Sequence, residues 1–203
     1  QGSFSYFSTE TPDGRRGGHA GLLFAGADYV VMPGLLVGAM LQLDWMDQGG
    51  TGIGMNAGGQ GWMVGPYLSA RLTPNLFLDA RSLWGRSSNQ IDPLGAYVDT
   101  FATSRWLLSA RLSGNWASGA WRLTPSAELI YFSERQEAYT NAIGIGIDAH
   151  SVYLGRLTFG PEIGYKLKFD DGGTFEPFLG LKGVWDFART DETTAAGEVV
   201  GAD

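Results

Sequence analysis

Long segments of this chain alternate between apolar and polar residues. In "TFEPFLGLKGVWDF", Thr174 to Phe187, the odd positions from Phe175 onward are almost wholly apolar or aromatic, and the charged Glu176, Lys182 and Asp186 fall on the even positions. Successive side chains of a β-strand point to opposite faces, so the pattern predicts a two-faced strand. Helical periodicity is not convincing anywhere, and an all-β fold is therefore the expectation.

Period-two alternation predicts nine strands with alternating short and long connections. The sequence favours tight turns at "MPG" (32–34), "TPN" (73–75), "NWASG" (115–119) and "DDGG" (170–173), whose residues supply the dihedral angles of a reversal. Longer links are expected near 10–17, 48–59, 88–99 and 134–150. This layout is typical of an antiparallel up-and-down barrel in an outer membrane. The predicted strands are 2–9, 18–31, 36–47, 60–72, 76–87, 100–114, 120–133, 151–169 and 175–188.

Composition excludes several classes of protein. The 203 residues suffice for one domain, 1–203, and the net charge of -7 argues against binding nucleic acid. Cysteine is absent and only 17% of residues are charged, while 13% are aromatic, too many for a disordered chain. No apolar run is long enough for a transmembrane helix, so strands would have to span any membrane.

Alternation alone fits a soluble barrel with its faces exchanged. Large aromatic side chains near the strand ends favour a membrane barrel, as does a polar face that mixes small residues with charges of both signs. A strand such as 60–72 would rise about 33 Å at a tilt of about 40°, more than the apolar band of about 25 Å. On a lipid-facing surface, Lys182 alone would cost about 2–4 kcal/mol. We therefore expect the apolar face to meet lipid and the charged face to line a lumen.

The alternation assigns candidate residues to each face. Lumen charges can either contact transiting chain or pair across neighbouring strands, which is the default use of such charges in a barrel wall. The lumen-facing candidates are Asp44, Asp79, Arg81, Arg105, Arg111, Arg122, Glu128, Arg156, Glu162, Lys166, Lys182 and Asp186. The lipid-facing or girdle candidates are Tyr29, Trp45, Trp84, Trp106, Trp116, Trp121, Tyr131, Phe159, Tyr165, Trp185 and Phe187.

An odd number of strands raises the question of closure, because a bilayer tolerates no unpaired strand edge. With the short turns on the periplasmic side, strands 2–9 and 175–188 both run outward. Residues 189–203 are then expected to form an external loop or a truncated tail. We expect that further strands are missing from this chain or are supplied by another one.

The stretch "GRRGGHAGLLFAGADYVVMPGLLVGAMLQLDWMD" (14–47) resembles the early strands of the autotransporter β-domain, the barrel of type V secretion. The segments "GWMVGPYLSARLTPNLFLDARSLWGRSSNQ", "RLTFGPEIGYKLKF" and "FEPFLGLKGVWDF" are similar to its middle and later strands. The resemblance implies a twelve-stranded barrel, of which this chain resembles the first nine strands. It also implies a linker helix and a passenger domain before Gln1, and an assembly machinery that reads a final aromatic residue. The ending "EVVGAD" departs from that signal.

The function expected from these features is a non-catalytic translocator and anchor in the outer membrane of a Gram-negative bacterium. Its partners would be outer-membrane lipid, a passenger in the same chain and the assembly machinery, and no cofactor or metal is expected. An outer-membrane channel and a soluble β-barrel ligand binder are the alternatives. An outer-membrane protease would need acids beside a histidine, and His150 with Asp148 is the nearest such pair. "GGTGIG" (49–54) precedes no helix and is interpreted as a flexible loop.

Overall fold

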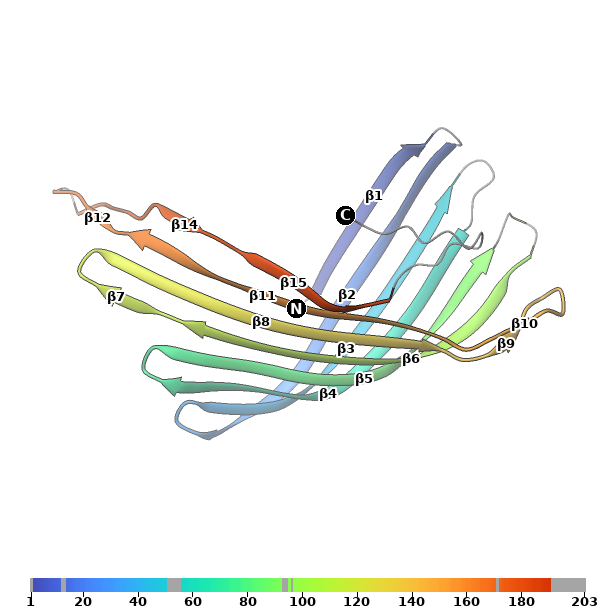
Figure 1. The fold of residues 1–203 in the computed structure, drawn as a ribbon, viewed down its shortest axis with the longest axis horizontal. Helices are drawn as coiled ribbons and strands as arrows, with labels where there is room; N and C mark the ends of the chain where they lie inside the picture. Colours follow the sequence, from blue (N-terminus) through green and yellow to red (C-terminus); the bar gives the residue numbers. More distant parts are fainter. Residues whose placement is uncertain are drawn as a thin grey trace.

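The computed structural model describes residues 2–11, 14–50, 56–92, 95, 97–170 and 172–190, which form a strongly curved antiparallel sheet (Figure 1). Its strands follow one another in chain order from β1 to β11, with β14 and β15 both paired along the far edge of β11. The main strands are β1 (Gly2–Thr11), β2 (Gly14–Met32), β3 (Leu35–Gly50), β4 (Asn56–Thr73), β5 (Leu76–Asp92), β6 (Asp99–Gly114), β8 (Trp121–Gln136), β11 (His150–Tyr165), β14 (Phe178–Gly180) and β15 (Gly183–Arg189).

The first eight predicted strands are confirmed, and most of them are longer than predicted, although the predicted 151–169 strand ends at Tyr165. Residues 10–11 and 14–17 belong to β1 and β2, so the prediction of a long link over 10–17 was wrong. The 134–150 link contains a small hairpin of β9 (Tyr139–Thr140) and β10 (Gly146–Ile147). Short β7 (Trp116–Ser118) pairs with β8. Of the expected tail, residues 191–203 lie outside the described residues.

The last predicted strand is interrupted rather than continuous. Residues 175–188 divide among β13 (Thr174–Phe175), which pairs with β12 (Leu167–Lys168), and then β14 and β15. Pro177 has no N–H to donate, which breaks a ladder at that point. The backbone still holds the segment against β11, because Tyr165 N donates to Pro177 O at 3.0 Å and Leu181 N donates to Pro161 O at 3.1 Å.

The polar face of the sheet is the more buried one, as expected for the concave side of a curved sheet. Met63 and Leu83, at 2% and 0% exposure, are the two most buried apolar side chains among the described residues, and both lie on this face. Beside them the β4–β5 ladder is interrupted between the pairs Val64↔Trp84 and Tyr67↔Arg81. A Cβ on Gly65 would meet Ser82 O, so glycine allows the two backbones to approach closely where the sheet bends.

The predicted all-β antiparallel class is confirmed, and the sheet is open. Within the described residues, β1 pairs with β2 alone, and the edge formed by β14 and β15 pairs only with β11. No helix in the described part of the chain is long and apolar enough to cross a membrane.

Candidate functional site

The register of the strands places the predicted lumen charges together on the concave face. The cross-strand pairs Asp79↔Arg111 and Arg111↔Glu128, for example, continue one row over three strands. Lys166 and Lys182 fall in breaks of the ladder, where pairing does not fix a face. The candidates on the concave face are Asp44, Asp79, Arg81, Arg105, Arg111, Arg122, Glu128, Arg156, Glu162 and Asp186. That this face lines a lumen stays a prediction.

The predicted lipid-facing aromatics share the opposite, convex face. Cross-strand pairs such as Trp84↔Trp106 and Trp121↔Tyr165 fix their side, and the Trp121 and Tyr165 rings pack edge to face at 4.7 Å. Tyr29 is 74% exposed and Trp185 is 59% exposed, which is unusual for such large apolar groups in water. Contact of this face with lipid stays a prediction.

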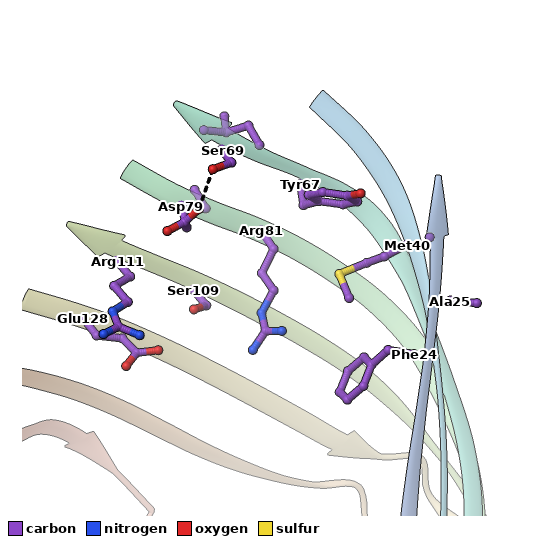
Figure 2. A pocket seen from close by; sticks show the side chains of 13 residues that line it. Phe24, Ala25, Met40, Tyr67, Ser69, Asp79, Arg81, Ser109, Arg111 and Glu128 are labelled. Atoms are coloured by element: carbon purple, nitrogen blue, oxygen red, sulfur yellow. Dashed lines mark hydrogen bonds between the residues drawn. The ribbon is translucent and has the colours of Figure 1, made fainter. Parts of the chain in front are cut away.

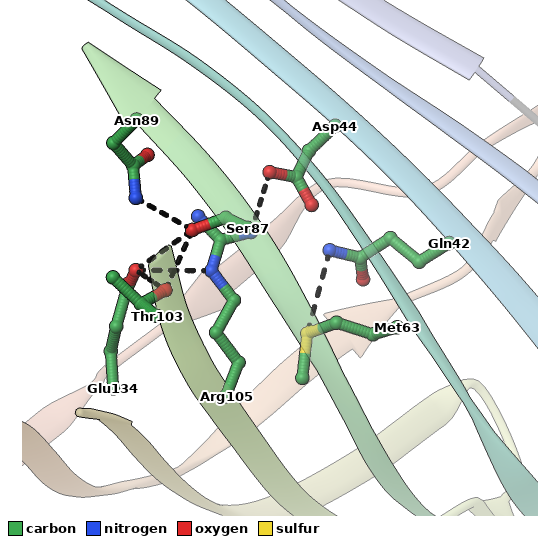
Figure 3. Close-up of polar contacts among 8 residues, drawn as sticks. All are labelled: Gln42, Asp44, Met63, Ser87, Asn89, Thr103, Arg105 and Glu134. Carbon is green, nitrogen blue, oxygen red and sulfur yellow. Dashed lines mark hydrogen bonds and ion pairs between the residues drawn. The ribbon is translucent and has the colours of Figure 1, made fainter. Parts of the chain in front are cut away.

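An arginine joins three strands on the concave face (Figure 3). Arg105 of β6 donates from Nη1 to Asp44 Oδ2 of β3 at 2.6 Å, and from Nε to Glu134 Oε1 of β8 at 3.2 Å. The three side chains are only 15–20% exposed. Charge-assisted bonds in such a setting are strong, because little water screens them.

Hydroxyl and amide groups complete this cluster. Thr103 donates to Glu134 Oε1 at 2.6 Å, and Ser87 lies 2.6 Å from Thr103 and 3.3 Å from the same carboxylate oxygen. Asn89 Nδ2 donates to Ser87 Oγ at 2.8 Å. We refer to Asp44, Ser87, Asn89, Thr103, Arg105 and Glu134 as the Arg105 cluster.

A glycine provides the path for the Arg105–Asp44 bond. β4 and β5 lie between the two residues, and Gly61 of β4 is the cross-strand partner of both Asp44 and Ser87. A Cβ on Gly61 would meet Arg105 Nη1, and would lie 2.9 Å from Asp44 Oδ2. The ion pair therefore occupies the space that any larger residue at position 61 would fill.

Three further ion pairs, formed by two arginines, hold the last strands. Arg122 of β8 bonds Glu162 of β11 at 3.2 Å and also donates from Nε to Glu176. Arg156 of β11 forms a two-pronged bond with Asp186 of β15, at 2.6 Å and 2.9 Å. These residues are more exposed than the Arg105 cluster, between 28% and 43%. They support cross-strand pairing as one use of the concave-face charges.

A hollow of about 700 Å³ lies on the concave face, and its lining includes Asp79, Arg81 and Arg111 (Figure 2). Arg81 projects into it, and the ion pairs of the described residues do not include Arg81. Asp79 is held by Ser69, which donates to it at 2.7 Å. At the rim, Tyr67 Oη donates to Asp28 at 2.5 Å across Gly38.

The long-loop end carries an ordered hairpin. Asp99, at the start of β6, is 5% exposed and accepts the Ala142 N–H at 2.7 Å, and the Tyr139 ring stacks on Phe101 at 5.6 Å. Burial raises the pKa of the Tyr139 hydroxyl, and the negative charge of Asp99 raises it further. The 134–150 link is thus fastened to β6.

No hydrogen bond or ion pair joins His150 to Asp148 in the described structure, where His150 is instead the cross-strand partner of Gln136. The described residues likewise contain no group of three or more His, Cys, Asp or Glu that could hold a metal ion.

Glu134 and Gly61 were not among the predicted site residues. Glu134 continues the polar alternation of Arg122, Thr124 and Glu128, but the predicted strand ended at residue 133, one position too early. Continued alternation would have identified it. Gly61 carried no signal of its own, since its role depends on a bond between two other strands.

Together these features define a class: an open antiparallel sheet with long strands, a charged concave face and an aromatic convex face. A family profile described as "Autotransporter beta-domain" matches residues 1–203. The chain belongs to this family of outer-membrane β-domains, as its sequence resemblance predicted. Among solved structures, the fold is similar to that of the β domain of the Bordetella autotransporter BrkA, with a TM-score of 0.62 and 17% identity over 92% of this chain and 78% of that chain. No curated protein matches.

Proposed function

We propose that this chain is a translocator and anchor in the outer membrane of a Gram-negative bacterium, which exports or displays an N-terminal passenger at the cell surface without catalysis. Outer-membrane lipid, the passenger and the assembly machinery are its partners in this proposal. Membership of the autotransporter β-domain family and the BrkA-like fold support it.

The observation that carries the proposal is the separation of charge and aromatic area between the two faces. The concave face holds the Arg105 cluster and the hollow beside Arg81, which suit a hydrated path. The convex face exposes Trp84 at 55% and Trp121 at 57%, which suits lipid. A transport path needs no reacting group, only a wall that stays polar inside and apolar outside.

Surface display of the passenger tests the proposal. The complete gene, with an epitope in its passenger, would be expressed in a Gram-negative host, and antibody binding to intact cells would be measured. We expect the epitope at the surface, and we expect Arg81→Glu to reduce it while the barrel still folds. Arg81→Lys, which keeps the positive charge at the same position, is the matched control and leaves display unchanged.

Folding of each variant is checked by resistance to protease in isolated outer membranes. A well-assembled native barrel whose passenger remains in the periplasm would contradict the translocator function. If the protein is instead an outer-membrane channel, the complete protein should show a large, steady conductance in planar bilayers. Display of the passenger should then not depend on the barrel.

A further inference from the structure

Two arginines lie on the convex, apolar face of the sheet. Arg86 of β5 and Arg135 of β8 are in one cross-strand row, with Ser104 of β6 between them. Both arginines are exposed, and none of the ion pairs formed by the described residues involves either one. With neighbouring strands about 4.8 Å apart, their Cα atoms are separated by about 10 Å.

The row lies at a defined distance from the short turns. Ten residues separate Arg86 from Leu76, where β5 begins. That is about 33 Å along the strand and about 25 Å across a membrane at a tilt of about 40°, equal to the height of the apolar band. An outward arginine costs about 2–4 kcal/mol at the bilayer midplane and close to zero at the interface. The row therefore belongs at the headgroup level of the leaflet on the long-loop side.

Aromatic rings cover the wall directly below the arginines. Trp84 and Trp106 are cross-strand partners in the next row, and Trp106 packs edge to face on Tyr131 with ring centres 5.5 Å apart. Trp84 is 55% exposed and Trp106 is 43% exposed. An acyl chain on this surface would meet apolar rings, while its headgroup would meet two cations.

We propose that Arg86 and Arg135 bind the phosphorylated headgroup of an anionic lipid in the leaflet on the long-loop side. The planar guanidinium group recognises phosphate oxygens with paired N–H donors, and the Ser104 hydroxyl between the two arginines adds a further donor. Charge complementarity selects the headgroup, and the rings of Trp84 and Trp106 select a lipid over free phosphate. This inference rests on the proposed function, because it requires the convex face to lie in a bilayer.

Fluorescence quenching at one defined position tests the inference. The chain has no cysteine, so Leu108→Cys, on the convex face of β6 below the row, accepts a single bimane label. The complete protein would be folded into phosphatidylcholine vesicles that contain phosphatidic acid, with brominated acyl chains on one lipid or the other. We expect brominated phosphatidic acid to quench as though enriched roughly thirtyfold at the label, as two arginines at a membrane surface predict.

Matched variants test whether the two arginines cause the preference for phosphatidic acid. Arg86→Gln with Arg135→Gln should abolish it, whereas Arg81→Gln, on β5 but on the concave face, should leave it intact. A label at Leu123, also convex but near the short turns, should show no preference. If the double variant fails to fold, the native protein is measured at increasing salt concentration. The preference for phosphatidic acid must then weaken, because salt screens the charges of the arginines.

The outcomes separate this inference from the proposed function. Equal quenching by both lipids, or a preference that survives both high salt and the double substitution, overturns the inference while the convex face remains in lipid. Absence of quenching by either lipid shows that position 108 is not in the bilayer, and then both the inference and the translocator function fail.

Discussion

Arg105 Nη1 of β6 lies 2.6 Å from Asp44 Oδ2 of β3, across the two strands that separate them in the sheet. Ladder hydrogen bonds connect only adjacent strands, so this ion pair ties together a part of the wall that no single ladder spans. The second ion pair of Arg105, with Glu134 of β8, extends the connection to the strand on the other side of β6.

Loss of the Arg105 charge should weaken the fold. Arg105→Gln leaves Asp44 and Glu134 without their cation in a poorly hydrated site, and we expect it to lower the unfolding free energy by about 3 kcal/mol. Urea titration of the protein folded in vesicles measures this. Arg111→Gln, on the same strand and face, is the control and should cost less than about 1 kcal/mol. Equal effects of the two substitutions would show that the cluster has no special role.

Position 61 should tolerate only glycine. Gly61→Ala places a methyl group where the Arg105–Asp44 bond runs, so it should destabilise the native chain. Its effect should be smaller once Arg105→Gln has removed that bond, when only Asp44 Oδ2 and Ser87 Cβ still lie close to the methyl group. A double-mutant cycle by urea titration measures the coupling. Gly58→Ala on the same strand is the control, since its Cβ would meet Met46 O at an ordinary 3.5 Å. Additive effects of Gly61→Ala and Arg105→Gln would count against this geometry.

The Arg156–Asp186 pair should matter much less than the Arg105 cluster. Its side chains are 43% and 28% exposed, so water competes for the bond. Arg156→Gln is therefore expected to lower the unfolding free energy by only a small fraction of the Arg105→Gln effect. The same urea titration compares them directly, and a larger loss for Arg156→Gln would reverse the ranking derived from exposure.

Asp99 should hold the β9–β10 hairpin against β6. Asp99→Ala removes the acceptor of the Ala142 N–H, so hydrogen exchange at that amide should speed up while exchange in β6 stays slow. The Tyr139 pKa should fall part of the way to its ordinary value, because the carboxylate charge is lost but burial remains. Asp148→Ala in the same loop is the control.

Absorbance titration, with Tyr139→Phe to assign the signal, follows the tyrosine. Because folding raises this pKa, the stability it contributes is present below the unfolded value and is lost as pH rises through the folded value. A Tyr139 titration unchanged by Asp99→Ala would refute the electrostatic contact.

Strand positions and faces were predictable because side-chain alternation is a local property. Trp106 and Arg105 could be assigned to opposite faces from their neighbours alone. The partners of Arg105 were not predictable, because they depend on the register of β3, β6 and β8, which the sequence of no single strand contains. The break at Pro177 had a local signal in the missing N–H, yet the alternation continued through it and masked the interruption.

Contact of the convex face with lipid is the central claim, and regular strand β6 tests it most directly. Single cysteines at positions 106 through 112 of the complete protein would carry spin labels in vesicles, and collision with oxygen would be compared with collision with a water-soluble nickel reagent. We predict that 106, 108, 110 and 112 collide with oxygen, while 107, 109 and 111 favour nickel. If the even positions collide with neither reagent, the aromatic face is a dry protein core, and the account of a membrane translocator is wrong.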